Sequence, residues 1–121
     1  MPKTFSLSLL TLLALPASAL QEDLPLGRYR CYAPPSYAVT AWFDVTDGQT
    51  YRYQGRSEGR LRFDASSATV RWLDGALAEH YAGGRFFTPA SGAPTGERFA
   101  IVLEPRPGSA APASECFLTT H

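Results

Sequence analysis

The sequence predicts an all-β fold: a small antiparallel up-and-down barrel or sandwich of about eight short strands with one disulfide. Three observations support this prediction. Apolar and polar residues alternate in short runs, which is the pattern of half-buried strands. Turn-forming residues separate these runs at roughly ten-residue spacing. The chain contains 10 Gly and 10 Pro, and both residue types destabilise helix interiors, so long helices are disfavoured.

The first 19 of the 121 residues have the features of a secretory signal peptide. A cationic start at Lys3 precedes an apolar run over residues 5–15, and residues 17–19 form an Ala-Ser-Ala cleavage site. The apolar run is shorter than the about 20 residues of a membrane-spanning helix, and no second stretch of that length follows. We therefore expect a periplasmic or secreted protein with a single β domain in residues 20–121.

Eight runs of the domain are predicted to be strands. They cover residues 27–32, 37–45, 50–54, 60–64, 69–73, 85–88, 97–104 and 115–118. The Asp47-Gly48 pair is a strong hairpin signal between the second and third runs. Residues 76–82 fit one or two helical turns that Asp74 caps and the glycines at 83 and 84 stop, but a loop or an irregular strand fits equally well.

The alternation assigns an inner and an outer face to the strands. The predicted inward residues are Tyr29, Cys31, Val39, Ala41, Phe43, Val45, Tyr51, Tyr53, Leu61, Phe63, Val70, Trp72, Phe99, Ile101 and Leu103. The predicted outward residues are Arg28, Arg30, Thr40, Trp42, Asp44, Arg52, Arg60, Arg62 and Arg71. The inner face is therefore aromatic and the outer face is rich in arginine.

Each face offers a candidate binding surface. An aromatic-lined interior would let Tyr51, Tyr53 and Trp72 contact a small ligand, although the same rings could be plain core. The outer Arg52, Arg60 and Arg71 could bind an anionic polymer or an acidic protein.

The outer face has an ordinary alternative. Its arginines could be solvated and paired across strands with Asp44, Glu58 and Asp64. The formal net charge of the whole chain is zero, and nucleic-acid binding without sequence preference depends on clustered positive charge. We therefore expect no nucleic-acid partner.

Cys31 and Cys116 are the only two cysteines. An even count in an exported chain predicts an intramolecular disulfide, with free thiols or intermolecular bridges as the alternatives. Such a bridge would close a loop of about 85 residues, for which the loop-entropy model gives roughly 4–5 kcal/mol. The bond would bring the last strand beside the first.

Little in the sequence favours catalysis. His80 and His121 are the only histidines, and no spacing typical of metal ligands, nucleophile elbows or phosphate-binding glycine loops is present. We expect no enzyme activity, no metal and no cofactor.

The Gly27-x-Tyr29-x-Cys31 start resembles that of small exported bacterial β domains. The resemblance also rests on Tyr51, Tyr53, the Gly59-Arg-Leu61 and Trp72-Leu-Asp-Gly75-Ala-Leu77 segments, and Cys116. It implies export and a β fold. The opening is also similar to the Gly-x-aromatic start of lipocalin- and avidin-like meander barrels, with a tyrosine where lipocalins carry tryptophan.

A Tyr-x-Cys start with a late cysteine is also similar to periplasmic lysozyme inhibitors of the small β-barrel type. We expect a non-catalytic, exported binding protein for a small ligand or an envelope partner. The alternative is a periplasmic inhibitor of a cell-wall hydrolase such as lysozyme. It would act through a projecting loop, such as residues 74–84 or 89–95.

Overall fold

The computed structural model describes residues 23–89 and 98–119. The expected signal peptide, residues 1–19, lies outside the described residues, as does most of the predicted loop 89–95. The described elements are β1 (Gly27–Ala33), β2 (Ala38–Asp47), β3 (Thr50–Tyr53), β4 (Ser57–Asp64), β5 (Thr69–Trp72), α2 (Ala76–His80), β6 (Tyr81–Phe87), β7 (Ala100–Pro105) and β8 (Ser114–Leu118).

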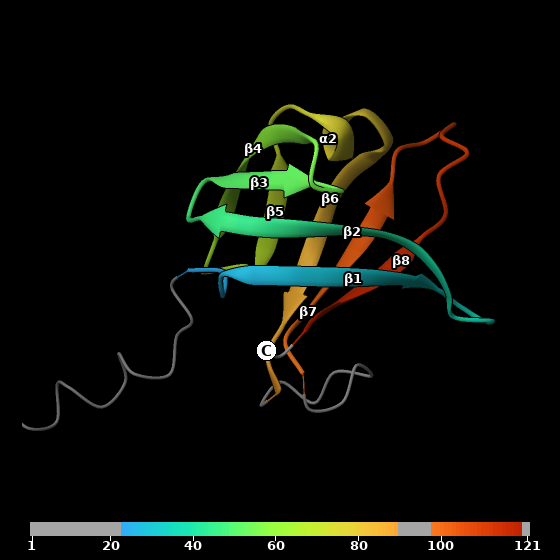
Figure 1. Cartoon of the computed structure of the whole chain (residues 1–121), viewed down its shortest axis with the longest axis horizontal. Coiled ribbons are helices and arrows are strands. Elements are labelled where there is room, and N and C mark those ends of the chain that lie inside the picture. Colours follow the sequence, from blue (N-terminus) through green and yellow to red (C-terminus); the bar gives the residue numbers. More distant parts are fainter. Residues whose placement is uncertain (1–22, 90–97, 120–121) are drawn as a thin grey trace, which may run out of the picture.

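The strands form a closed barrel in which neighbours in the sequence are neighbours in the sheet. Every pairing is antiparallel, and β1 closes the barrel by pairing with both β2 and β8. In Figure 1, β1 and β2 run as long strands across the molecule, and β7 and β8 cross them at a steep angle. The predicted all-β meander is confirmed, and closure selects the barrel over the sandwich. Closure also removes exposed sheet edges.

The predicted disulfide lies at the seam of the barrel. Cys31 of β1 and Cys116 of β8 are directly paired positions and are bonded to each other. Both side chains are fully buried. The bond therefore ties the first strand to the last at the point where the sheet closes.

The aromatic face lies inside the barrel, as the alternation predicts. Its most deeply buried members are Tyr29, Phe43, Val45, Tyr51, Leu61, Val70, Trp72, Ile101 and Leu103. Tyr53, Phe63 and Phe99 are partly buried and pack against this core. Period-two alternation therefore gave the correct inner face for most of the sheet.

The inward assignment of Val39 is wrong, since its side chain is 59% exposed. Cys31 pairs with Ala41, but the next residue of β1, Tyr32, pairs with Val39. Thr40 is therefore an extra residue in β2, a bulge that reverses the alternation beyond it. The Thr40 Oγ1 atom lies 3.0 Å from the Ser114 Oγ atom.

The segment between β5 and β6 is a short helix followed by a strand that begins earlier than expected. Helix α2 ends at His80, and both predicted stop glycines lie within β6. Asp74 does not cap the helix, which Gly75 precedes with no side-chain cap. Leu77 of α2 is buried in the barrel core. Figure 1 shows α2 across the end of the barrel near β3 and β4.

Candidate binding surface

The barrel interior is filled by rings that contact one another. Trp72 lies 5.6 Å from Phe43 and 5.4 Å from Tyr51 between ring centroids, both in T-shaped arrangements. Tyr51 is fully buried and Trp72 is 3% exposed. Edge-to-face contacts of this kind are typical of a packed core. Three hollows that the described residues form lie on the outer surface instead.

The hydroxyl of Tyr51 is used to hold α2. It donates a hydrogen bond to the Asp74 carbonyl at 2.8 Å and accepts one from the Leu77 amide at 3.0 Å. Two glycines make room for it, because a Cβ atom at Gly59 or Gly75 would lie 2.5 Å from the Tyr51 oxygen. Burial raises the pKa of Tyr51, although the Leu77 amide opposes the shift. The Tyr51 hydroxyl therefore hydrogen-bonds to the backbone at both of these positions and connects β3 to α2.

Two other tyrosine hydroxyls of the interior have a backbone partner, whereas the Trp72 indole nitrogen has none within the described ranges. The Tyr29 hydroxyl donates to the Pro25 carbonyl at 2.8 Å, and the Tyr81 hydroxyl donates to the Pro112 carbonyl at 2.9 Å. Among the described residues, the buried Trp72 Nε1 atom has no hydrogen-bond partner, and the indole is packed between aromatic rings. The predicted binding role of Tyr51, Tyr53 and Trp72 stays a prediction, with core packing as their visible role.

Four outward arginines have a carboxylate partner. Arg28 pairs with Asp44 at 2.8 Å, Arg52 with Glu58 at 3.1 Å, Arg60 with Asp74 at 2.9 Å, and Arg85 with Glu104 at 3.2 Å. The Arg28 guanidinium also lies 4.0 Å from the ring centroid of the half-buried Trp42. The pairs at Asp44 and Glu58 agree with the ordinary interpretation of the outer face, in which its arginines are paired across strands.

Arg62 of β4 and Arg71 of β5 are different. They are directly opposed in the antiparallel pair, and both side chains are exposed. Cross-strand partners of this kind have Cβ atoms about 4.5–5.5 Å apart, and like charges in this position repel. Neither arginine has an ion-pair partner in the described part of the chain.

Asp64, which the sequence placed among the possible partners of the arginines, is engaged in its own turn. It accepts hydrogen bonds from the Ser66 hydroxyl at 2.7 Å and the Ser66 amide at 3.0 Å. These hydrogen bonds lower the pKa of the Asp64 carboxyl, which stays ionised at neutral pH. Arg60 is paired with Asp74 instead. The Asp74 carboxylate accepts hydrogen bonds from the Arg60 backbone amide at 2.7 Å and from the Arg60 guanidinium at 2.9 Å.

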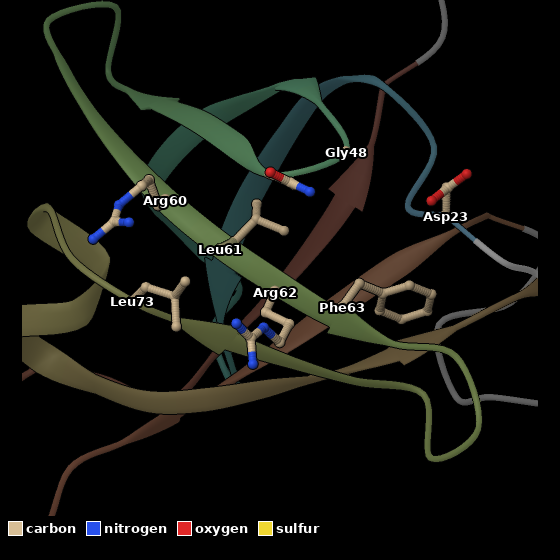
Figure 2. Close-up of a pocket in the computed structure, with 8 residues that line it drawn as sticks. Asp23, Gly48, Arg60, Leu61, Arg62, Phe63 and Leu73 are labelled. Atoms are coloured by element: carbon tan, nitrogen blue, oxygen red, sulfur yellow. The ribbon is translucent and has the colours of Figure 1, made fainter.

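Two adjoining hollows follow this pair of strands. One, of about 230 Å³, is lined by Arg62, Asp64, Thr69 and Arg71. The other, of about 310 Å³, lies along β4; its lining includes Arg60, Arg62, Phe63, Leu73 and Asp23. Figure 2 shows Arg60 and Arg62 on the same strand, with Phe63 and Asp23 farther along the hollow. We call Arg60, Arg62 and Arg71, with these hollows, the arginine face.

Of the three arginines that the sequence nominated, the structure therefore brings Arg60 and Arg71 to one surface. Arg52 is engaged with Glu58 on β3 and β4. Arg62, which belonged to the predicted outward set, is the residue that completes the pair with Arg71. The pairing register of β4 with β5 places Arg62 opposite Arg71. This register cannot be read from the alternation within either strand.

A third hollow was not predicted. It has a volume of about 310 Å³ and is lined by Tyr32, Tyr37, Arg98 and Phe117. The only sequence signal near it is the Pro34-Pro35 turn, which ends at Tyr37. Because Arg98 and Phe117 come from the far end of the chain, only tertiary structure brings the four residues together.

Of the two loops proposed for hydrolase inhibition, residues 89–95 lie mostly outside the described residues. Residues 74–84 pack against the barrel, where Leu77 is buried and its amide donates to the Tyr51 hydroxyl of β3, and so do not project.

No group of three or more His, Cys, Asp or Glu residues in the described ranges could hold a metal ion. Within the same ranges, no helix is both long and apolar enough to cross a bilayer.

Comparisons with protein-family models, with curated proteins and with solved structures found no match. The eight-strand meander agrees with the fold that the resemblance to lipocalin- and avidin-like barrels implied.

Proposed function

We propose that the protein is an exported, non-catalytic binding module whose arginine face takes an acidic segment of a partner protein. The observation that carries this proposal is the direct opposition of Arg62 and Arg71 without a carboxylate between them. Two arginines at directly paired strand positions can together offer donors to one carboxylate. A bound carboxylate would also relieve their mutual repulsion.

The surroundings favour a protein segment over a dense polyanion. The carboxylates of Asp64 and Asp23 line the same two hollows, and they would repel a chain of phosphates. Phe63 and Leu73 add apolar surface beside the arginines; Leu73 is 37% exposed. An extended peptide in which acidic and apolar side chains alternate matches both features.

Export is part of the same proposal. It is supported by the signal-like residues 1–19 and by the disulfide between Cys31 and Cys116, a bond that persists in oxidising compartments. Mass spectrometry of the protein from the periplasm and the medium should give a chain that begins near residue 20. An intact chain that stays in the cytoplasm would contradict this part of the proposal.

The arginine face can be tested with a labelled synthetic peptide that alternates Glu with Phe, by fluorescence anisotropy. We expect binding that weakens with salt and that falls about tenfold or more in the Arg62→Gln/Arg71→Gln double variant, since hydrogen bonds to charged groups contribute about 1.5–3 kcal/mol. A peptide with Gln in place of Glu should bind weakly.

The matched control is the Arg28→Gln/Arg85→Gln double variant, which removes the same charge from two arginines that already have carboxylate partners. It should bind the acidic peptide almost as wild type does. Equal losses in the two double variants would show a nonspecific charge effect and reject the site. Absence of binding by the wild type would reject it as well.

A further inference from the structure

The third hollow lies on a different side of the barrel from the arginine face. Tyr32 belongs to β1 and Phe117 to β8, whereas Arg62 and Arg71 belong to β4 and β5. In a closed barrel of eight strands, these two strand pairs are four positions apart. The hollow is therefore independent of the surface on which the proposed function rests.

Aromatic rings form most of its wall. The Tyr32 and Phe117 rings lie 5.9 Å apart between centroids, and the Arg98 guanidinium lies 4.6 Å from the Phe117 centroid. Tyr37 contributes a ring that is 48% exposed. Beside Tyr32, its strand partner Val39 adds an exposed apolar side chain. An aromatic and apolar surface is thus gathered at one place.

The Tyr37 side chain is held where its ring stays exposed. The turn before it contains two prolines, which fix their own backbone angles, and the Tyr37 amide donates to the Ala33 carbonyl at 2.7 Å. Tyr37 has a φ of 59°, a left-handed conformation that favours glycine. Its hydroxyl donates to the Glu115 carboxylate at 3.3 Å. The backbone and the hydroxyl together therefore fix where the Tyr37 ring lies.

Charged groups of both signs lie at the hollow. Arg98 lies over Phe117, and Glu115 accepts the hydrogen bond from Tyr37. The Arg98 guanidinium can donate hydrogen bonds and the Glu115 carboxylate can accept them, while the exposed Arg30, paired with Phe117 across β1 and β8, adds further donors. A ligand that uses such a surface has an apolar face for the rings and hydroxyl groups around its edge.

We propose that this hollow binds a neutral saccharide, with one sugar ring against Tyr37 and its hydroxyl groups toward Arg98 and Glu115. The faces of pyranose rings carry C–H groups that stack on aromatic rings, while their hydroxyl groups both donate and accept hydrogen bonds. The volume of about 310 Å³ is at the lower end of ligand pockets, about 300–1,000 Å³, as suits a single ring.

The test is an NMR titration of the ¹⁵N-labelled full domain with cellotriose, maltotriose and triacetylchitotriose as separate probes. We expect at least one of them to shift the amide signals of Tyr32, Tyr37, Glu115 and Phe117, with a millimolar dissociation constant. Lack of shifts with all three probes would overturn the proposal. Shifts with benzyl alcohol alone would overturn it too, because they would indicate a purely apolar site.

Tyr37→Gly separates binding from folding, because glycine suits the backbone conformation while it removes the ring. We expect at least a tenfold loss of saccharide affinity with no loss of folding stability. Ala68→Gly is the matched control: Ala68 also has a left-handed φ, of 56°, in another turn. Ala68→Gly should keep saccharide binding. Wild-type affinity in Tyr37→Gly would show that the hollow is not the site.

The two binding proposals can fail separately. The Arg62→Gln/Arg71→Gln variant should bind the saccharide as wild type does, and Tyr37→Gly should bind the acidic peptide as wild type does. Loss of saccharide binding in the arginine variant would place the sugar on the arginine face and reject the hollow.

Discussion

The Tyr51 hydroxyl donates a hydrogen bond to the Asp74 carbonyl across 23 residues of sequence. The same oxygen accepts from the Leu77 amide, which lies in α2. One buried phenol therefore holds the helix to the end of the barrel. Removal of the hydroxyl would leave a carbonyl and an amide without this partner.

Tyr51→Phe should lower the free energy of unfolding by about 1–3 kcal/mol, the cost of a buried polar group left unsatisfied. The measurement is urea unfolding at neutral pH. Tyr53→Phe is the matched control, because the Tyr53 hydroxyl has no hydrogen-bond partner in the described part of the chain; its stability should change little. Equal effects of the two substitutions would contradict the role given to Tyr51.

Gly75→Ala should destabilise the domain strongly. Gly75 has a φ of +90°, and an added Cβ would lie 2.5 Å from the Tyr51 oxygen and 2.8 Å from the Gly59 Cα. Backbone strain alone costs about 1–3 kcal/mol, and the clash with Tyr51 adds to it. Thermal and urea unfolding should both show the loss.

Gly108→Ala is the control for that substitution. Gly108 has a similar φ of +84°, but an added Cβ there meets nothing within 4 Å. It should carry the strain without the clash and be less destabilising than Gly75→Ala. If both variants lost the same stability, the contact among Tyr51, Gly59 and Gly75 would have no measurable role.

The sequence predicted an antiparallel β meander, as a barrel or a sandwich, because alternation is a local property that survives in each strand. It placed Tyr51 and Trp72 inward and Arg62 and Arg71 outward, all in agreement with the structure. Val39 was misplaced because a bulge at Thr40 depends on pairing with β1, which a single strand does not reveal. Local pattern therefore gave the faces but not the register.

The candidate sites were harder to predict for the same reason. Asp74 fits a helix cap by its position, yet its carboxylate binds Arg60, 14 residues earlier. The third hollow needs Tyr37 beside Glu115, 78 residues later. Such contacts depend on how strands meet, so composition and spacing cannot supply them.

Alkaline pH should destabilise the barrel through its buried tyrosines. Burial raises the pKa of Tyr29, Tyr51 and Tyr81 above the ordinary value. The folded state therefore keeps these protons longer than the unfolded state, where tyrosine ionises near pH 10. Their contribution to stability is fully present below about pH 10 and is lost as pH rises through the folded-state values.

Ultraviolet difference absorbance should show some tyrosines ionising only as the fold is lost. Tyr29→Phe should make stability fall less steeply above pH 10, because it removes one of these groups. Ionisation of all tyrosines near pH 10 in a folded domain would contradict the prediction.

Arg71→Gln should stabilise the free protein. The substitution removes one of two like charges directly opposed across β4 and β5, and such pairs change stability by about 0.2–1 kcal/mol. Urea unfolding at low salt is the measurement. The gain should shrink as salt is added, since about 0.1 M salt screens charges over about 10 Å.

The control is Arg85→Gln, in which the lost arginine is paired with Glu104 on a neighbouring strand. This exposed ion pair is worth about 0–1 kcal/mol, so its loss should leave stability unchanged or slightly reduced. If Arg71→Gln both stabilises the fold and weakens binding of the acidic peptide, then Arg71 lowers the free energy of unfolding while it serves binding. If Arg71→Gln instead destabilised the domain, Arg62 and Arg71 would not repel each other, and the reason to seek a carboxylate between them would disappear.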